Sequence, residues 1–178
     1  MKSVVLGFSG KIGTGKTTIS SGVANVLGWP RVSFGDFIRS EAQRRGLEFT
    51  REALQSIGAS LVDGNSERFC RSVLSQANWK PGQNLIVDGV RHAKIAYTLR
   101  QIVLPSDFSL VFITLNESVR RKRLATSELC YLTQIEANTT EVQVGTLLLE
   151  LADLVVDGNS AVGVLVDEIA EWVRQQMN

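Results

Sequence analysis

The residues GKIGTGKT, at positions 10–17, match the phosphate-binding pattern G-x-x-x-x-G-K-[ST] at every fixed position. An apolar run at residues 4–8 comes before them and a helical pattern at residues 17–27 comes after them, which predicts a strand, a glycine-rich loop and a helix. In that arrangement the backbone N–H groups of the loop and the N-terminus of the helix point at one spot, where an anion is favoured. The sequence therefore predicts a site for the phosphates of a nucleotide.

The residues of this loop have separate expected roles. Gly10, Gly13 and Gly15 lack a Cβ atom, so the backbone can take positive φ and come close to a ligand. Lys16 is expected to neutralise the β- and γ-phosphates in catalysis, and the Thr17 hydroxyl is expected to bind Mg²⁺. A glycine turn alone would need neither of these two residues. The predicted nucleotide-binding residues are Gly10, Lys11, Ile12, Gly13, Thr14, Gly15, Lys16, Thr17 and Thr18.

The stretch SFGDFIR follows a predicted strand at residues 31–34 and contains an acidic and a basic residue three positions apart. Asp36 is expected to cap the helix that begins there. Arg39 lies on the same helix face, from which its side chain can hold a second anion at the mouth of the sheet. We predict both residues as substrate-binding. The alternative is a helix cap followed by a solvated arginine, and the residue types alone do not decide between the two.

The stretch LIVDGVRH begins with a predicted strand at residues 85–87 and continues past its carboxyl end. Asp88 is expected to lie near the nucleotide phosphates, where its carboxylate can hold Mg²⁺ directly or through water, or orient an attacking oxygen. Arg91 is expected to project back over the mouth of the sheet and to bind the substrate. The alternative interpretation is an Asp-Gly turn that ends the strand.

The stretch NESVRRKRLATSE follows a predicted strand at residues 109–114 and concentrates positive charge. Arg120 and Arg123 are one helical turn apart. Phosphoryl transfer needs positive charge around the moving group, which a mobile helix can supply on closure, so we predict both as catalytic. The alternative is a solvated basic helix face. A later stretch, VVDGNSA, predicts a turn at residues 157–159 beside the glycine-rich loop, where it can border the base of a nucleotide. The alternative, an ordinary strand-to-helix turn, stays open.

The periodicity of the chain predicts an α/β fold. Apolar runs alternate with amphipathic helical patterns, which implies a parallel sheet covered by helices on both faces. Ligands of such sheets lie at the carboxyl ends of the strands, where all the stretches described above fall. The predicted strands are residues 4–8, 31–34, 85–87, 109–114 and 154–156, and the predicted helices are residues 17–27, 36–45, 51–62, 67–76, 93–103, 117–125, 141–151 and 161–176.

Composition limits the classes of function and partner. The chain has 178 residues, enough for one domain, and a formal net charge of +1, so no strong basic bias points to nucleic acid. No apolar run approaches the roughly 20 residues that a membrane span needs, so no membrane partner is indicated. Cys70 and Cys130 form no CxxC motif and are expected to be reduced thiols of a cytoplasmic protein, and the single His92 offers no metal cluster.

In this order, the motifs GKIGTGKTT, SFGDFIR, VDGVR, RRKR and VVDG resemble the nucleoside monophosphate kinase group of P-loop kinases over almost the whole chain. That group includes adenylate, cytidylate and phage-type deoxynucleoside monophosphate kinases and, more distantly, dephospho-CoA kinases. The resemblance implies that Arg39 and Arg91 hold the phosphate of the acceptor, that Asp88 helps to bind Mg²⁺, and that Arg120 and Arg123 surround the transferred phosphoryl group.

The resemblance also implies a fold and its subdivision. We expect a three-layer α/β/α P-loop fold with a five-stranded parallel sheet, whose third strand lies between the second and the first. One kinase domain is expected over residues 1–178, with acceptor-binding helices at about residues 36–80 and a lid at about residues 117–140.

The expected activity is Mg²⁺-dependent transfer of the γ-phosphate of ATP to a small phosphate-bearing acceptor, foremost a nucleoside or deoxynucleoside monophosphate. A monophosphate oxygen is already ionised, so positioning and charge neutralisation can carry the catalysis. Two alternatives stay open. A hydroxyl acceptor, as in dephospho-CoA or a sugar, would require Asp36 or Asp88 as base. An ATP-binding regulatory module would transfer nothing. The lack of Lys and Arg at residues 125–140 favours it, and the pair of predicted acceptor arginines, Arg39 and Arg91, disfavours it.

Overall fold

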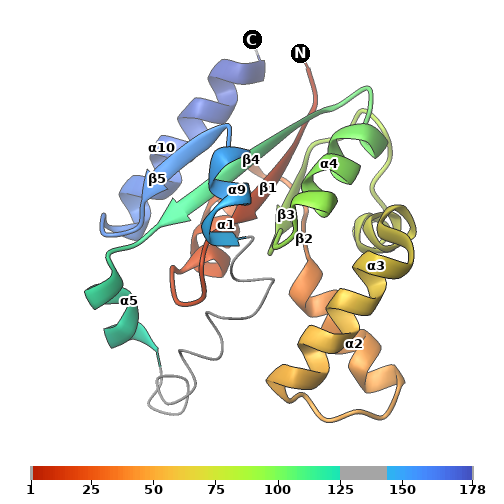
Figure 1. The fold of residues 1–178 in the computed structure, drawn as a ribbon. Helices are drawn as coiled ribbons and strands as arrows, with labels where there is room; N and C mark the ends of the chain where they lie inside the picture. Colours follow the sequence, from red (N-terminus) through yellow and green to blue (C-terminus); the bar gives the residue numbers. More distant parts are fainter. Residues whose placement is uncertain (1, 125–143, 178) are drawn as a thin grey trace.

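Figure 1 shows the computed structural model of the protein, which describes residues 2–124 and 144–177. Its centre is a five-stranded parallel sheet with the strand order β2-β3-β1-β4-β5. The third strand therefore lies between the second and the first, as expected. The strands are β1 (Val4–Ser9), β2 (Arg31–Ser33), β3 (Leu85–Asp88), β4 (Asp107–Thr114) and β5 (Leu154–Asp157).

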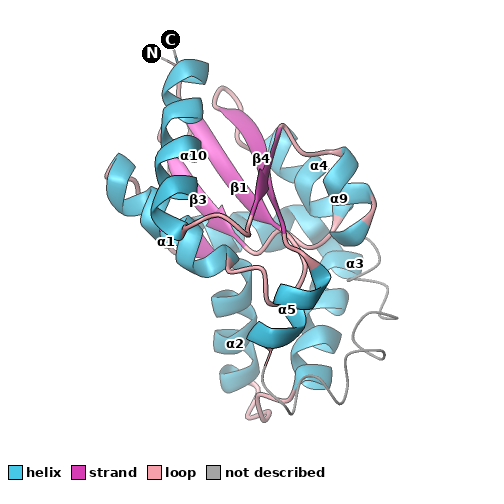
Figure 2. Cartoon of the chain, turned by 90° about the vertical axis from the view of Figure 1, so that its left-hand side faces the viewer, coloured by secondary structure: helices cyan, strands magenta, loops and turns pink. Residues whose placement is uncertain are grey.

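Helices cover both faces of this sheet, which confirms the three-layer α/β/α architecture (Figures 1 and 2). One face packs against α1 (Lys16–Leu27) and α10 (Val162–Met177), and the other against α3 (Arg51–Ser75), α4 (Ala93–Ile102) and α9 (Leu147–Glu150). Successive strand residues point to opposite faces, so β1 feeds both cores. Val5 belongs to the α3–α4 core, whereas Leu6 and Phe8 belong to the α1–α10 core.

The helix α2 (Phe34–Arg44) starts directly after β2 and extends with the first part of α3 beyond the carboxyl edge of the sheet (Figure 1). The prediction that Asp36 caps this helix is wrong. The N-cap is Ser33, whose Oγ accepts a hydrogen bond from the backbone N–H of Asp36 at 3.2 Å. A serine three residues earlier satisfies that N–H, so Asp36 lies inside the first turn and its carboxylate is available for other contacts.

The helices predicted at residues 51–62 and 67–76 are joined in the structure. They form the single element α3, which is interrupted at Asn65, where φ is −160° and ψ is 93°. The side chain of Asn65 accepts a hydrogen bond from the backbone N–H of Arg68 at 2.8 Å and so starts the second part of the helix. The gap between the two predicted helices is thus a kink that one asparagine accommodates.

Two predicted helices extend into residues 125–143, which lie outside the described residues. The helix predicted at residues 117–125 is α5 (Glu117–Arg123), and most of the predicted lid follows it there. Of the helix predicted at residues 141–151, the described part contains α9. Within residues 2–124 and 144–177, no helix has both the length and the apolar character needed to cross a bilayer.

Strand register brings the predicted site residues to one edge of the sheet. Phe8 of β1 and Ser33 of β2 both pair with Asp88 of β3, although these residues are far apart in the chain. The loop after β1 and the turn after β3 therefore leave the sheet side by side. This edge is where an open parallel α/β sheet binds its ligand.

Candidate active site

The loop between β1 and α1 has the backbone conformation of a phosphate-binding loop. The φ angles of Gly10, Gly13 and Gly15 are +145°, +84° and +84°, values that favour glycine. A Cβ atom on Gly10 would lie 2.6 Å from the carbonyl oxygen of Ile113 in β4, so this loop also passes too close to the sheet for any larger residue. The three glycines thus fix a loop that ends at the N-terminus of α1.

The side chain of Lys16 lies along this loop and is 8% exposed. Its Nζ donates a hydrogen bond to the backbone carbonyl of Lys11 at 2.7 Å, and the Thr14 hydroxyl donates to the same carbonyl at 2.9 Å. Lys16 also lines the cavity described below. Its ammonium group is therefore held at the loop, beside that cavity.

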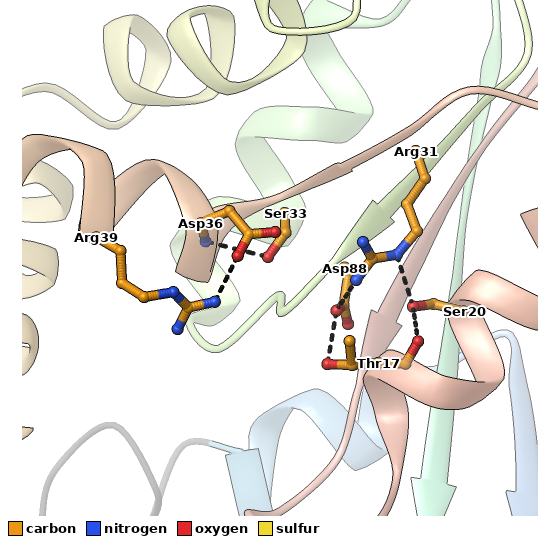
Figure 3. A network of polar contacts seen from close by, with 7 residues as sticks. All are labelled: Thr17, Ser20, Arg31, Ser33, Asp36, Arg39 and Asp88. Carbon is orange, nitrogen blue, oxygen red and sulfur yellow. Dashed lines mark hydrogen bonds and ion pairs between the residues drawn. The ribbon is translucent and has the colours of Figure 1, made fainter.

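Asp88 is almost fully buried, at 3% exposure, and lies against the start of α1 (Figure 3). Its Oδ2 accepts hydrogen bonds from the Thr17 hydroxyl, at 3.0 Å, and from the guanidinium of Arg31. Among the described residues, no donor reaches Oδ1. A buried carboxylate oxygen without a partner is costly, and a hydroxyl lies beside it, so this pair of oxygen ligands fits Mg²⁺.

Arg31 is a member of this cluster that the sequence analysis did not predict. Its Nε donates to the hydroxyl of Ser20 at 3.0 Å, and that hydroxyl donates to the backbone carbonyl of Thr17 at 3.1 Å. The guanidinium thus connects α1 to the end of β3 (Figure 3). The feature of the sequence that could have indicated Arg31 is its position at the start of an otherwise buried strand, because a charged residue there requires a partner.

Asp36 and Arg39 form a second carboxylate–guanidinium pair on α2 (Figure 3). Arg39 Nη2 is 2.5 Å from Asp36 Oδ1, and the two side chains are 51% and 57% exposed. Arg39 lines the cavity, so the structure places this predicted residue at the mouth of the sheet. Asp36 reaches the site through its contact with Arg39.

A cavity of about 500 Å³ connects the glycine-rich loop with α2, α3 and α4. It brings together the predicted residues Lys16, Thr17, Arg39, Asp88 and Arg91. The lining residues are Ile12, Lys16, Thr17, Ser33, Phe34, Gly35, Ile38, Arg39, Phe49, Arg51, Leu54, Gln55, Gly58, Val62, Phe69, Asp88, Gly89, Arg91, His92 and Ile95.

The cavity has a charged side and an apolar side. Lys16, Arg39, Arg51 and Arg91 supply positive charge, and Asp88 is the one carboxylate among these lining residues. The apolar side comes from α2 and α3, whose Phe34 and Phe69 rings pack edge to face with centroids 5.1 Å apart. This combination suits a ligand with an anionic group at one end and an apolar or planar body at the other.

Sequence reasoning missed the cavity residues supplied by the start of α3 and by the segment before it. Phe49, Arg51, Leu54 and Gln55 come from a region whose helical pattern showed no base-reading motif. These residues reach the cavity because α2 and α3 pack closely together. At that contact, a Cβ atom on Gly58 would lie 3.2 Å from Ile38 Cδ1. A close helix–helix approach at a glycine was the signal that could have indicated this wall.

Arg120 is 1% exposed and packs against the glycine-rich loop. Its Nη1 donates to the carbonyl of Ile12 at 3.2 Å, while its Nε and Nη2 bind the carboxylate of Glu117 at 3.0 and 2.8 Å. The hydrogen bond from Arg120 is the main reason that the pKa of Glu117 lies below its usual value. A Cβ atom on Gly13 would lie 3.3 Å from Arg120 Cγ, so the arginine stem covers that glycine.

Arg123 lies on the other side of the same loop. Its Nη2 donates to the carbonyl of Gly158 at 3.4 Å, and its Nη1 is 3.9 Å from a Cβ atom built on Gly15. The turn after β5 is closed by Asp157, whose Oδ1 accepts from the backbone N–H of Asn159 at 3.0 Å. The turn at residues 157–159 therefore does lie beside the glycine-rich loop, with Arg123 between them.

A sheet with this strand order and a loop of this conformation define a P-loop protein of the kinase-like α/β class. Residues 6–142 match the model of the AAA domain family, and the chain belongs to that family. A UPF0200 protein of Pyrobaculum aerophilum is 30% identical over 122 residues, which are 67% of this chain and 64% of that relative. The chain thus spans slightly less than two thirds of that relative's length.

Two kinds of kinase are also similar to the chain. A cytidylate kinase of Pyrobaculum aerophilum is 50% identical over 46 residues, 26% of this chain and 25% of that enzyme. The shikimate kinase structures from Aquifex aeolicus and Bacteroides thetaiotaomicron align with TM-scores of 0.64 and 0.62 at 18% and 12% identity. The two alignments cover 97% and 96% of this chain and 98% of each kinase chain. The predicted resemblance to the nucleoside monophosphate kinase-like P-loop group is confirmed.

Proposed function

We propose that the protein transfers the γ-phosphate of ATP to a small acceptor that already carries a phosphate, foremost a nucleoside or deoxynucleoside monophosphate. The observation that carries this proposal is the single cavity that joins Lys16 and Thr17 of the loop to Arg39 and Arg91. A nucleotide on the loop and an anion on the two arginines would then lie in one space. The short match to a cytidylate kinase supports the same class of acceptor.

The nucleotide half of the site is supported by residues of the loop. On nucleotide binding, Lys16 exchanges the Lys11 carbonyl for the β- and γ-phosphates. Thr17 and Asp88 are the residues that would hold Mg²⁺, which when bound neutralises phosphate charge. The backbone N–H groups of residues 13–17 and the N-terminus of α1 hold the remaining phosphate oxygens.

The acceptor half is supported by side chains from α2 and from the segment between β3 and α4. The planar guanidinium groups of Arg39 and Arg91 can each hold two oxygens of one acceptor phosphate. The apolar wall that includes Phe34 and Phe69 packs against the rest of the acceptor and excludes water. The acceptor phosphate is thereby presented toward the γ-phosphate.

In the transfer step, an oxygen of the acceptor phosphate forms a bond to the γ-phosphorus while the bond from that phosphorus to the β–γ bridging oxygen breaks. ADP leaves with the bond's electron pair. The attacking oxygen is already ionised, so no proton has to be removed, and Lys16 and Arg123 stabilise the charge on the moving group. Arg120, which the sequence analysis also predicts as catalytic, instead supports the loop through its contacts with Glu117 and the Ile12 carbonyl.

A hydroxyl acceptor is the second candidate, and the contacts of the two carboxylates disfavour it. Such an acceptor requires a base, but Arg39 engages Asp36, Arg31 and Thr17 engage Oδ2 of Asp88, and the remaining Oδ1 of Asp88 is the oxygen proposed for Mg²⁺. An acceptor that needs no base therefore agrees better with the geometry. We also propose a cytoplasmic location, in which the buried free thiol of Cys70 would stay reduced.

The experiment that tests this function is coupled ADP release with a panel of nucleoside and deoxynucleoside monophosphates, in parallel with shikimate, a sugar and water alone. We expect at least one monophosphate to stimulate release well above the rate with water. Release that only a hydroxyl acceptor stimulates would replace the proposal with the second candidate. Tight ATP binding with no stimulated release would identify a regulatory module instead.

A further inference from the structure

Arg31 connects two elements of the nucleotide site without lining the cavity itself. Its guanidinium donates to Ser20 of α1 and to Asp88 at the end of β3. The side chain of Arg31 is 20% exposed and that of Asp88 is 4% exposed, so solvent screens this ion pair only weakly. A charge in this position acts on whatever binds at Asp88.

The contacts of Asp88 are divided unequally between its two oxygens. Oδ2 accepts from both Thr17 and Arg31, whereas Oδ1 is buried with no donor among the described residues. Because two donors from different elements hold Oδ2, the carboxylate is fixed in rotation. Asp88 lines the cavity, so the ordered side chain is presented to a ligand there.

The charges around Asp88 oppose the binding of a free metal ion. Arg31 cancels the charge of the carboxylate, and Lys16 of the same cavity adds a further positive charge. A divalent cation without nucleotide would therefore bind at a site that has no net negative charge. Arg31 lies close to that site and solvent screens it only weakly, so it repels the cation. A metal–ATP complex carries net negative charge, so the same guanidinium attracts it.

We propose that Arg31 is a positioning residue that orients Asp88 and sets the charge of the metal site, so that the site takes up metal together with nucleotide and rejects metal alone. This inference rests on the proposed function in one respect, which is that a metal–ATP complex is the ligand. A residue that only braced α1 against β3 would affect both ligands in the same direction. If Arg31 sets the charge of the site, its removal should strengthen the binding of free metal and weaken the binding of the metal–nucleotide complex. If Arg31 is only a brace, its removal should change both affinities in the same direction.

The experiment titrates Mn²⁺ into the nucleotide-free protein at pH 8 and measures free Mn²⁺ by electron paramagnetic resonance. The variants are Arg31→Gln, which removes the charge, and Arg31→Lys, which keeps it. Arg100→Gln is the matched control, because Arg100 also forms an ion pair between elements, with Asp153 at 3.1 Å, outside the site. A second titration uses Mg²⁺ with a non-hydrolysable ATP analogue, followed by tryptophan fluorescence.

We expect Arg31→Gln to bind free Mn²⁺ about tenfold or more tightly than the wild type, and the metal–nucleotide complex several-fold more weakly. Arg31→Lys and Arg100→Gln should resemble the wild type in the Mn²⁺ titration. Adding Asp88→Asn to Arg31→Gln should remove the gain. Arg31→Met, with a stem of similar length, replaces Arg31→Gln if the latter does not fold by circular dichroism.

Unchanged or weaker Mn²⁺ binding in a folded Arg31→Gln or Arg31→Met protein would overturn the inference. So would a change of the same sign for both ligands, which is the behaviour of a structural brace. The Mn²⁺ titration needs no acceptor and no turnover. If the Mn²⁺ titration shows no gain in affinity while a monophosphate still stimulates ADP release, the proposed role of Arg31 is wrong and the proposed function still stands.

Discussion

The two carboxylate–guanidinium pairs of the site differ in burial and in origin. Asp88 and Arg31 come from neighbouring strands, and both contact α1. Their side chains, taken without the backbone, are 4% and 20% exposed. Asp36 and Arg39 are three residues apart on α2 and are more than half exposed. The first pair is held by several elements at once, whereas the second is an ordinary helix-surface pair that solvent screens.

The same difference extends to the two halves of the proposed site, one at the glycine-rich loop and one at α2 and α3. In the nucleotide half, Thr14, Lys16 and Asp88 are 2%, 8% and 3% exposed and already have fixed partners. In the acceptor half, Arg39 of α2 and Phe49 of the segment between α2 and α3 are exposed, and they lie in the part of the chain that extends beyond the sheet. The nucleotide half is therefore organised before its ligand binds, and the acceptor half is expected to become ordered by closing on its ligand.

The largest expected effect comes from the nucleotide half. Lys16→Ala should leave the fold intact and reduce phosphoryl transfer by about 10²–10³-fold, because it removes a preorganised charge from the γ-phosphate. The measurement is kcat in the coupled ADP assay, with folding checked by circular dichroism. Lys94→Ala is the matched control, since Lys94 Nζ also donates to a backbone carbonyl, that of Val62 at 2.9 Å. Normal turnover of Lys16→Ala is incompatible with the P-loop assignment.

The next effect distinguishes the two ligands. Arg91→Ala should lower kcat/KM for the acceptor by roughly 10- to 150-fold, since a hydrogen bond to a charged group contributes about 1.5–3 kcal/mol. Its affinity for ATP without acceptor should hardly change, because the loop supplies those contacts. Arg91→Lys should recover only part of the loss, since lysine cannot hold two oxygens in the same plane.

Arg39→Ala should act in the same direction, and the double variant with Arg91→Ala should be less than additive if both hold one phosphate. Arg44→Ala is the control for Arg39, because it removes an (i, i+3) pair with Glu41 from the same helix outside the cavity. If Arg91→Ala weakens ATP binding and leaves the acceptor unaffected, the assignment of the two halves is reversed.

A smaller effect separates the two arginines of α5. Arg120→Met should raise the Kd for ATP and lower the Tm by about 2–12 °C, because it leaves the partly buried Ile12 carbonyl without this donor at a cost of up to about 1–3 kcal/mol. Arg123→Met should instead lower kcat with little change in Tm. Arg121→Ala is the control, since exposed Arg121 also pairs with Glu117, at 3.2 Å. Equal losses of kcat with unchanged ATP affinity in both variants would show that Arg120 does not brace the loop.

The smallest effect concerns the surface of α2. Two arginines, Arg44 first and then Arg45, lower the pKa of Glu41 from 4.5 to about 2. A folded-state pKa below the unfolded value means that this contribution to stability is complete above about pH 4.5 and is lost as the pH falls toward about 2. Glu41→Gln should lower the Tm by no more than about 4 °C at pH 7, and the difference from wild type should shrink at pH 3. A difference that stays constant between pH 7 and pH 3 would contradict the role of these pairs.

Local patterns predicted the nucleotide half well, and long-range contacts limited the rest. The three glycines of the loop and the position of Asp88 at the end of β3 follow from short motifs and from the rule that parallel strands end at one edge. Arg31 was missed because its partner Asp88 is 57 positions away. The sequence analysis expects Asp36 to cap α2, whereas Ser33 has the N-cap conformation and accepts the hydrogen bond.

The acceptor half was the harder part to predict for the same physical reason. Phe49 and Gln55 enter the cavity only because α2 and α3 pack closely at Gly58, and periodicity within one helix does not contain that information. The positions of Arg39 and Arg91 predict that they bind a substrate, and the resemblance implies that they hold the phosphate of the acceptor. Both roles remain predictions that the variants above test.

The central claim is that one cavity brings ATP and a phosphate-bearing acceptor together for direct transfer. The most direct measurement is ³¹P nuclear magnetic resonance of the wild-type protein with ATP, Mg²⁺ and the monophosphate that best stimulates ADP release. The account predicts loss of the γ-phosphate signal together with growth of a new diphosphate on the acceptor, without accumulation of inorganic phosphate. Growth of inorganic phosphate alone, with the acceptor monophosphate unchanged, would contradict it.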